Sequence, residues 1–269
     1  MIYREPFLVK AYFDAVEGFI KERMRPGPGS IPALLGMFER ELRFYREVAP
    51  NVGVRVPACY QAEETASGYR LVLEDLSTWR EGADPMSVAA LLADLHRRWE
   101  HRAEDQWPWL KRSTGAAEAI GRLYDDVWAS LCERPDVTSA VLNAGRRYVG
   151  RVAQLERDEV AFSRLTVIHG DASSGNIRSS AGGEVVLVDW EDVRLAGGAI
   201  DLTWYLVSSV EPPLWDAVLD AYGPDEAEIE DAFPHALTQA ILTFSDYEPG
   251  SPPAVAWIER LEEVARRLR

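Results

Sequence analysis

The chain has 269 residues, of which 47% are hydrophobic and 27% charged, values typical of a soluble globular protein with one large or two small domains. The formal charge of −15 disfavours nucleic acid and anionic membrane surfaces as partners, so a neutral or cationic small substrate fits better. No apolar run approaches the roughly 18 residues of a membrane span and no signal peptide opens the chain, so we expect a cytoplasmic protein.

The first predicted elements form a small mixed unit. The segment Phe7–Phe13, FLVKAYF, is rich in β-forming residues and predicts a strand, after which we expect a short helical stretch. The sequence PGPGS at 26–30 ends that stretch, and apolar residues spaced by three and four predict a helix over 31–49. Two further segments, 58–64 and 69–76, are joined by a short turn and predict an antiparallel hairpin.

The pattern changes at Met86, where long amphipathic helices begin. This change places a domain boundary between Leu76 and Asp84. We therefore expect an α+β protein with a small N-terminal lobe, residues 1–80, and a larger, mainly helical lobe, residues 81–269. The elements expected in the second lobe are, in order, a helix from Met86, helices over 116–132 and 137–157, a compact β region over 165–190, and helices from about residue 199 onward.

The residues that suggest a chemistry lie in the compact β region. Asp171 and Asn176 are five residues apart, and Asp189 ends an apolar strand that a tight hairpin would return beside them. Phosphoryl transfer requires a carboxylate that accepts the proton of an attacking hydroxyl, together with oxygen ligands for magnesium. Asp171 suits the first role, and Asn176 and Asp189 suit the second. Each residue alone could be a turn or capping residue, but the three together favour phosphoryl transfer.

This segment resembles the catalytic loop of aminoglycoside phosphotransferase-like and choline-kinase-like enzymes, which share the protein-kinase fold. Their pattern, H-G-D-x-x-x-x-N followed by an apolar strand ending in V-D-W, is matched here by HGDASSGN and VLVDWE. The resemblance implies that Asp171 is the catalytic base, that Asn176 and Asp189 bind magnesium, and that His169 supports the loop. It also implies that Asp201, in AIDLTWYL, buttresses the loop, with an ordinary helix-terminal carboxylate as the alternative.

The N-terminal lobe contains a candidate nucleotide-binding lysine. Lys10, one of only three lysines, lies within the strand Phe7–Phe13. The resemblance implies a lysine on an early strand that binds nucleotide phosphates and pairs with a helix glutamate. Glu41 is the expected partner, because it lies on the buried side of its helix. The surrounding RELRFYRE also resembles a subgroup related to ecdysteroid-kinase-like proteins, and the alternative is a surface lysine with an exposed glutamate.

The stretch YRLVLEDLS resembles the hinge of the same family, which implies that backbone groups around Glu74, Asp75 and Leu76 meet the adenine. Kinases of this fold usually carry a strand, a glycine-rich turn and a second strand before the lysine strand. Only nine residues precede Lys10, so we expect the N-terminal lobe to lack that hairpin. Either the chain begins downstream of its natural start, or it covers the phosphates differently, or it binds nucleotide poorly.

The sequence thus predicts an ATP- and magnesium-dependent kinase that phosphorylates a hydroxyl of a small molecule. Glu191 and Asp192 follow the Asp189 strand and are candidate contacts to the acceptor, which would be cationic if it carries an amine. The missing glycine-rich turn makes a non-catalytic nucleotide- or ligand-binding protein of the same fold the alternative. A two-metal phosphoesterase is disfavoured, because His169 alone among four histidines lies near the cluster.

Overall fold

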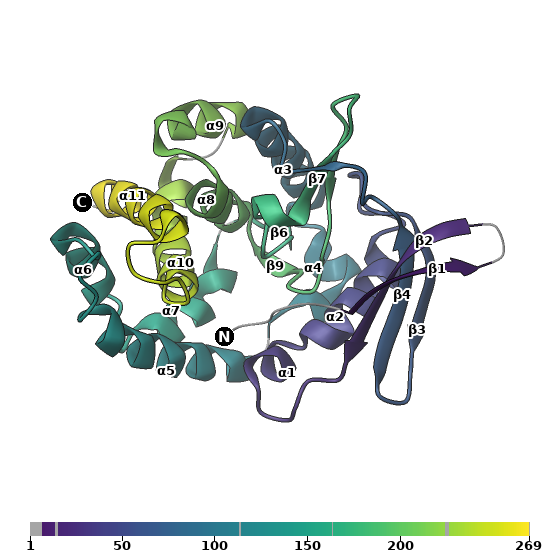
Figure 1. The fold of residues 1–269 in the computed structure, drawn as a ribbon, viewed down its shortest axis with the longest axis horizontal. Helices are drawn as coiled ribbons and strands as arrows, with labels where there is room; N and C mark the ends of the chain where they lie inside the picture. Colours follow the sequence, from purple (N-terminus) through teal and green to yellow (C-terminus); the bar gives the residue numbers. More distant parts are fainter. Residues whose placement is uncertain (1–6, 14–15, 113, 163, 224–225, 269) are drawn as a thin grey trace.

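The computed structural model describes residues 7–13, 16–112, 114–162, 164–223 and 226–268. Within these residues the chain forms two parts, a small antiparallel sheet with short helices beside it and a larger helical part (Figure 1). The compact β region that carries the loop 169–176 lies between the two parts (Figure 1). This is the order of elements that the sequence predicts for an α+β protein.

The N-terminal sheet has four antiparallel strands in the order β1-β2-β4-β3. They are β1 (Phe7–Phe13), β2 (Val16–Met24), β3 (Cys59–Glu64) and β4 (Gly68–Glu74). The strand predicted at Phe7–Phe13 and the predicted hairpin of β3 and β4 are both present. β4 lies between β2 and β3, and its largely apolar sequence fits this central, mostly buried position.

The segment expected as a short helix after Phe13 is instead the strand β2. Side chains alternate across a strand, so Phe19, Lys21 and Arg23 share one face of β2 and Ile20 lies on the other. β2 pairs with β1 along one edge and with β4 along the other. These two ladders satisfy backbone groups on both sides, whereas a helix of so few residues is marginal in water, and this explains why the strand forms.

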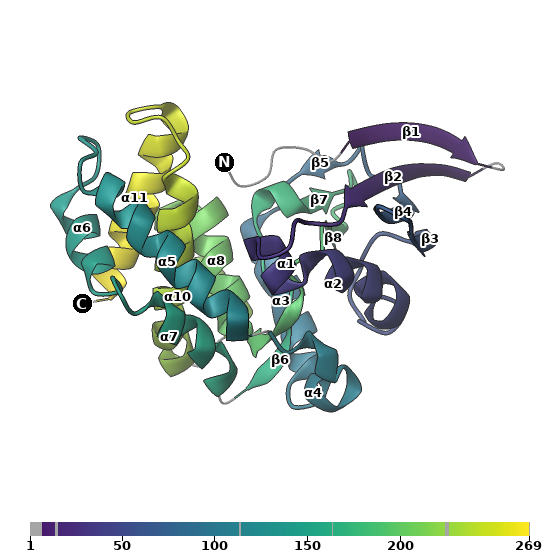
Figure 2. The ribbon, with the colours of Figure 1, turned by 90° about the horizontal axis from the view of Figure 1, so that it is seen from below.

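The helix predicted over 31–49 is divided into three pieces, α1 (Ile31–Leu35), α2 (Met37–Arg43) and a wider π-helical turn, η1 (Phe44–Val48). Gly36 separates α1 from α2 with a φ of 68°, a left-handed conformation that glycine adopts without steric cost. The predicted apolar stripe is buried, and α2 packs against the sheet while α1 lies beside α5 (Figure 2). The fully or nearly buried members of this stripe are Leu35, Phe38, Leu42 and Tyr45.

The C-terminal part is mainly helical. Its helices are α3 (Pro85–Trp99), α4 (Ala103–Gln106), α5 (Thr114–Leu131), α6 (Ser139–Arg146), α7 (Val152–Asp158), α8 (Gly198–Ser209), α9 (Trp215–Tyr222), α10 (Glu226–Phe244) and α11 (Pro252–Arg267). Short 3₁₀ turns lie at η2 (Pro108–Leu110), η3 (Glu159–Ala161), η4 (Ser174–Asn176) and η5 (Pro212–Leu214). The helix predicted over 137–157 is thus two helices, α6 and α7. Across the described residues, no helix has the length and apolar character that crossing a membrane requires.

Short strands position the candidate loop. β6 (Leu165–Ile168) pairs with β9 (Arg194–Gly197), and β7 (Ile177–Ser179) pairs with both β5 (Arg80–Glu81) and β8 (Val185–Leu187). The predicted tight hairpin is therefore the β7–β8 pair, with Ile177 opposite Leu187. It returns the chain so that the residues after β8 lie beside the loop between β6 and β7.

Arg40 on α2 joins the two parts of the molecule. Its Nη1 donates to the carbonyls of Leu110 and Val193, at 3.0 and 2.9 Å, and its Nη2 donates to the carbonyl of Lys111 at 2.8 Å. Its Nε donates to the carbonyl of Leu35 at 2.8 Å. Burial lowers the pKa of the guanidinium to about 10, so it stays charged at neutral pH. One buried side chain thus connects α1, the segment after η2 and the β8–β9 loop.

Candidate active site

The loop after β6 begins with a glycine that the packing requires. Gly170 has a φ of 89°, and a Cβ built on it would lie 2.3 Å from the carbonyl oxygen of Asp192. Both observations exclude an ordinary side chain at this position. Gly170 therefore allows the loop to approach the β8–β9 connection closely, and it places Asp171 immediately afterwards.

Both carboxylate oxygens of Asp171 accept a hydrogen bond. The indole Nε1 of Trp204, on α8, donates to Oδ1 at 2.7 Å, and the amide Nδ2 of Asn176 donates to Oδ2 at 2.9 Å. Burial raises the pKa of Asp171 above its ordinary value, which makes the carboxylate a better proton acceptor. The sequence indicated Asp171 and Asn176 but gave no signal that Trp204 would contact them.

Asp201 and His169 hold the loop from behind. The Asp201 carboxylate accepts hydrogen bonds from the backbone N–H groups of His169 at 2.6 Å and Gly170 at 2.8 Å. Burial would raise its pKa, but the hydrogen bond and charge of His96 lower it, so Asp201 is ionised at neutral pH. His169 is fully buried, and its Nε2 lies 2.9 Å from the carbonyl oxygen of Val188. The backbone N–H of Asp171 donates to His169 Nδ1 at 3.2 Å, so both predicted residues contact the loop backbone.

Asp189, directly after β8, has an unusual backbone conformation. Its φ is 63°, in the left-handed region that is uncommon for residues other than glycine. The backbone N–H of Val188 donates to the carbonyl of Asn176 at 2.9 Å, which ties the segment to the loop. Burial would raise the pKa of Asp189, but Lys21 outweighs it and the pKa is lowered. Asp189 and Asn176 are thus neighbours with oxygen-bearing side chains.

Among the described side chains, the lysine that pairs with Glu41 is Lys21 and not the predicted Lys10. Lys21 Nζ lies 2.7 Å from Glu41 Oε1 and 2.8 Å from Asp189 Oδ1. Burial would lower the pKa of Lys21, but these two carboxylates raise it above the usual value. Lys10 lies on β1, opposite Phe19 of β2. The error arose because residues 16–24 were expected to be helical, which hid the alternation that places Lys21 on the inner face.

With Lys21 as the paired lysine, more of the chain precedes the lysine strand than the prediction with Lys10 allowed. Because the paired lysine is on β2, one strand, β1, precedes the lysine strand and forms a hairpin with it. Residues 14–15, which connect these strands, are Asp-Ala in the sequence and lie outside the described residues. The sequence between Phe7 and Lys21 contains a single glycine, Gly18, so no glycine-rich turn occurs there.

The predicted acceptor contacts Glu191 and Asp192 both have arginine partners. Glu191 Oε2 lies 2.8 Å from Nη2 of Arg23 on β2, and Asp192 Oδ2 lies 2.9 Å from Nη1 of Arg194. Burial and the neighbouring Asp189 raise the pKa of Glu191 to about 7. Both carboxylates line the cleft described below and neither is a free charge, and their contact with an acceptor stays a prediction.

The predicted hinge residues lie at the start of the connection between the two parts. Glu74 ends β4, and its carboxylate pairs with Arg55. The Asp75 carboxylate accepts a hydrogen bond from the N–H of Ser77 at 2.8 Å, and Leu76 is buried. These side chains thus stabilise the connection itself, and contact of their backbone with adenine remains a prediction.

A cleft of about 1320 Å³ runs from the loop into the helical part. It exceeds the roughly 300–1,000 Å³ of most small-molecule pockets. Its lining includes Asp171, Asn176 and Asp189 together with residues of α1, α5, α10 and α11. Trp204 and Trp257, with ring centroids 6.0 Å apart, form an aromatic wall that continues to Tyr247 at 6.3 Å. The candidate base is therefore accessible to a sizeable organic molecule.

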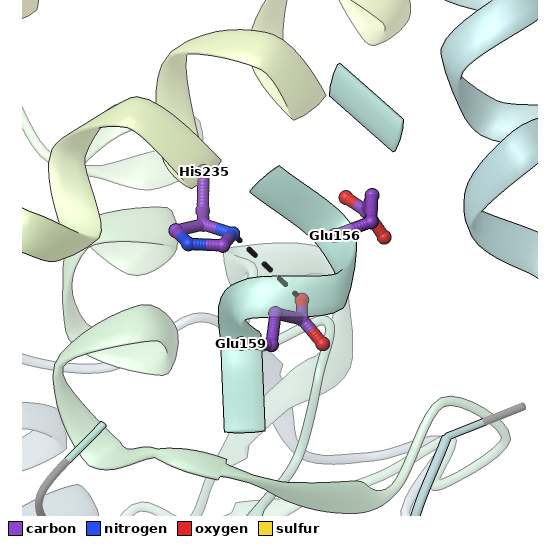
Figure 3. A group of neighbouring side chains, drawn as sticks. All are labelled: Glu156, Glu159 and His235. Carbon is purple, nitrogen blue, oxygen red and sulfur yellow. Dashed lines mark ion pairs between the residues drawn. The ribbon is translucent and has the colours of Figure 1, made fainter. Parts of the chain in front are cut away.

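A second acidic group lies in the wall of the same cleft (Figure 3). Glu156, at the end of α7, and Glu159, in η3, lie close to His235 of α10, and together they could hold a metal ion. However, Arg112 Nη1 lies 2.6 Å from Glu156 and 3.2 Å from Glu159, and Arg194 Nη2 lies 3.0 Å from Glu159. Because Arg112 and Arg194 already contact these carboxyl oxygens, a metal centre is not favoured at this group.

The residues around Asp189 suit magnesium better. Asp189 and Asn176 offer carboxylate and amide oxygens, the hard ligands that magnesium prefers. Lys21 and Arg23 pair with the acidic group that Asp189 forms with Glu41 and Glu191 in the same way, so that group as such is no better a metal centre. What distinguishes Asp189 is the neighbouring amide oxygen of Asn176. The donor set therefore fits a divalent cation that arrives together with phosphate groups, since protein ligands to magnesium are typically few.

The fold and the loop 169–176 together are typical of phosphotransferases with a kinase-like fold. The chain matches the model of the "Phosphotransferase enzyme family" over residues 30–232. It belongs to that family.

Solved structures of low sequence identity show the same fold. The choline kinase LicA from Streptococcus pneumoniae is 16% identical with a TM-score of 0.57, and the match covers 96% of this chain and 89% of LicA. A microcompartment-associated aminopropanol kinase is 14% identical with a TM-score of 0.59, covering 98% and 88% of the two chains. The amicoumacin kinase hAmiN, solved with AMP-PNP and Ca²⁺, is 13% identical with a TM-score of 0.53, covering 96% and 88%. The predicted kinase-like α+β fold is confirmed.

Proposed function

We propose that this protein is an ATP- and magnesium-dependent phosphotransferase that phosphorylates a hydroxyl group of a small molecule. The observation that carries the proposal is the arrangement of Asp171, Asn176 and Asp189 in the lining of an open cleft, with Lys21 held against Asp189. Family membership and three kinase structures of the same fold support it. Within the family, the RELRFYRE pattern supports the subgroup related to ecdysteroid-kinase-like proteins.

In the proposed reaction, Asp171 orients the acceptor hydroxyl and accepts its proton. The hydroxyl oxygen forms a bond to the terminal phosphorus of ATP, and the bond between that phosphorus and the bridging oxygen breaks, which leaves ADP. Asn176 and Asp189 would bind magnesium, which neutralises phosphate charge. Lys21 contributes a further positive charge, and Asp201 keeps the loop backbone in place.

We further propose a division of labour between the parts of the chain. Residues 1–80 bind the nucleotide, with the backbone around Glu74, Asp75 and Leu76 at the adenine, and residues 81–269 supply the loop and the acceptor site. The acceptor is a small alcohol that is neutral or positively charged. The acidic residues lining the cleft outnumber the arginines there, which supports this choice.

The first experiment is calorimetric titration of the full chain with ATP, with and without magnesium, followed by measurement of ADP release with a panel of acceptors. The panel contains amino alcohols, choline, amino sugars and neutral polyols. Magnesium-dependent ATP binding and acceptor-dependent ADP release would support the proposal. ATP binding with no ADP release above background, in the parent chain and in Asp171→Asn alike, would favour a non-catalytic nucleotide-binding protein.

A further inference from the structure

Strand β2 directs two cations toward the same segment of the C-terminal part. Arg23 follows Lys21 by two residues, so both side chains lie on one face of the strand. Lys21 contacts Asp189 at 2.8 Å, and Arg23 contacts Glu191, two residues further on, also at 2.8 Å. The two ion pairs run side by side between the sheet and the residues after β8.

The surroundings of the two cations differ. Lys21 is 4% exposed and is held between two carboxylates, Glu41 and Asp189. The side chain of Arg23 is 17% exposed and lines the cleft together with Asp171 and Asp189. Of the two, Arg23 therefore lies on the side where the acceptor hydroxyl and the transferred phosphoryl group must meet.

We infer that Arg23 is a second phosphate-binding cation, which exchanges its contact with Glu191 for the terminal phosphate of ATP. The inference rests on the proposed function, because it assigns a residue to the nucleotide of that same site. A guanidinium presents a planar fork of donors that matches phosphate oxygens, and its charge offsets the negative charge on the transferred group. The sequence from β1 to Lys21 contains no glycine-rich turn, so the Arg23 side chain supplies contacts that such a turn would otherwise make.

Glu191 has a defined part in this exchange. Without nucleotide it holds the guanidinium in the cleft at 2.8 Å, so Arg23 is positioned before ATP arrives. The carboxylate also competes with the phosphate for the same donors. Replacing it with the neutral Gln should weaken this competition, and Glu191→Gln should therefore bind ATP several-fold more tightly than the parent chain.

The test compares ATP with ADP, because only ATP carries the terminal phosphate. Dissociation constants of both nucleotides are measured by calorimetry with magnesium for the parent chain, Arg23→Gln and Arg23→Lys. Arg23→Gln should weaken ATP binding by at least tenfold and ADP binding by less than twofold, and Arg23→Lys should fall between Gln and the parent. Equal weakening of both nucleotides, or no change in either, would overturn the inference.

Arg25 provides a matched control on the same chain segment. Its guanidinium pairs with Glu64 at the surface, with both side chains about half exposed, so Arg25→Gln should leave both dissociation constants unchanged. If Arg23→Gln proves unstable, the single variants Arg23→Lys and Glu191→Gln still test the inference, because both keep a positive charge at residue 23. The first should weaken ATP binding relative to ADP binding, and the second should strengthen it. A parent chain that binds ATP but transfers phosphate to no acceptor would count against the proposed function alone. A parent chain that binds neither nucleotide would overturn both.

Discussion

Hydrogen-bond donors from two different elements fix the orientation of the Asp171 carboxylate. Asn176, in the loop, holds one carboxylate oxygen, and Trp204, on α8, holds the other. A carboxylate held on both sides loses little freedom when a hydroxyl arrives, which favours reaction through positioning. The direction of the base is therefore set partly by a helix that is distant in sequence.

The indole N–H of Trp204 should contribute to turnover. Trp204→Phe keeps the aromatic ring in the wall but removes the donor to Asp171, so we expect kcat to fall by about tenfold or more, the range for a hydrogen bond to a charged group. ATP affinity should change by less than about twofold, because Trp204 lines the cleft where we propose that the acceptor binds. Steady-state kinetics and calorimetry measure both quantities. Trp257→Phe, which alters the same wall, is the control, and an equal fall in its kcat would contradict a specific role for the Trp204 donor.

The two aspartates of the loop region should have separable roles. Asp171→Asn should lower kcat by about 10²-fold or more while leaving magnesium-dependent ATP binding intact, since it removes only the proton acceptor. Asp189→Asn should weaken magnesium-dependent ATP binding, because a charged ligand becomes a neutral one. Calorimetry with and without magnesium distinguishes the two effects. The same loss of binding in both variants would refute this division.

Among the elements, β2 shows most clearly why a strand could not be predicted from its own sequence. The sequence VEGFIKERM contains charged residues at spacings that also suit a helix, and nothing within the segment reveals that strands pair on both of its sides. The position of Lys21 on the inner face depends on those partners. Long-range pairing decided the structure of this segment, as commonly occurs where local propensity is weak.

Glu156, on the short helix α7, makes the stability of the fold depend on pH. Burial raises the pKa of Glu156 from 4.5 to about 7. Between these values the unfolded chain loses the proton while the folded chain keeps it, so stability is lost as the pH rises, by up to about 3 kcal/mol. Glu156→Gln removes this titration, so its stability relative to the parent should increase from pH 4.5 to 7.5. Denaturant unfolding measures the difference, and Glu118→Gln, at an exposed ion pair, should show no such trend.

Much of the candidate site could be predicted because its residues are close in sequence. Asp171, Asn176 and Asp189 lie in one strand–loop–hairpin unit whose geometry follows from local turns. Lys21, Arg23 and Trp204 were missed as site residues because they reach the site from elements distant in sequence, β2 for the two cations and α8 for Trp204. Gly36, which divides the long predicted helix, was missed for a different reason, since an isolated glycine within an apolar pattern is compatible with either a helix or a break.

At the scale of the whole molecule, charged side chains link the two parts, beside a hydrophobic core that extends through both. Lys21 and Arg23 reach from the sheet to the residues after β8, and Arg40 reaches from α2 to carbonyls of the C-terminal part. Arg40 differs from the other two because it binds backbone carbonyls, whereas Lys21 and Arg23 bind carboxylates. It therefore fixes one end of the connection, while the ion pairs of β2 lie at the end where we propose that nucleotide binds.

Removal of this fixed contact should affect the entire fold. Arg40→Met leaves four backbone carbonyls without their donor, so we expect a loss of about 2–4 kcal/mol in the free energy of unfolding. Urea denaturation measures the change. Arg46→Met is the control, because Arg46 donates to one carbonyl at the exposed surface and should cost less than about 1 kcal/mol. Equal losses in the two variants would show that Arg40 does not join the parts.

The backbone at Asp189 limits which residues can occupy that position. A φ of 63° is tolerated by glycine, asparagine and aspartate, whereas β-branched and bulky residues are strained there. In a library of all substitutions at residue 189, abundance of folded protein should therefore follow the left-handed preference, with Gly and Asn near the parent and Val and Ile lowest. Activity should follow the available oxygen ligands, with Asn ahead of Gly. Gly should therefore rank high for abundance and low for activity. Substitutions at residue 189 thus separate the requirement for a left-handed backbone from the requirement for an oxygen ligand.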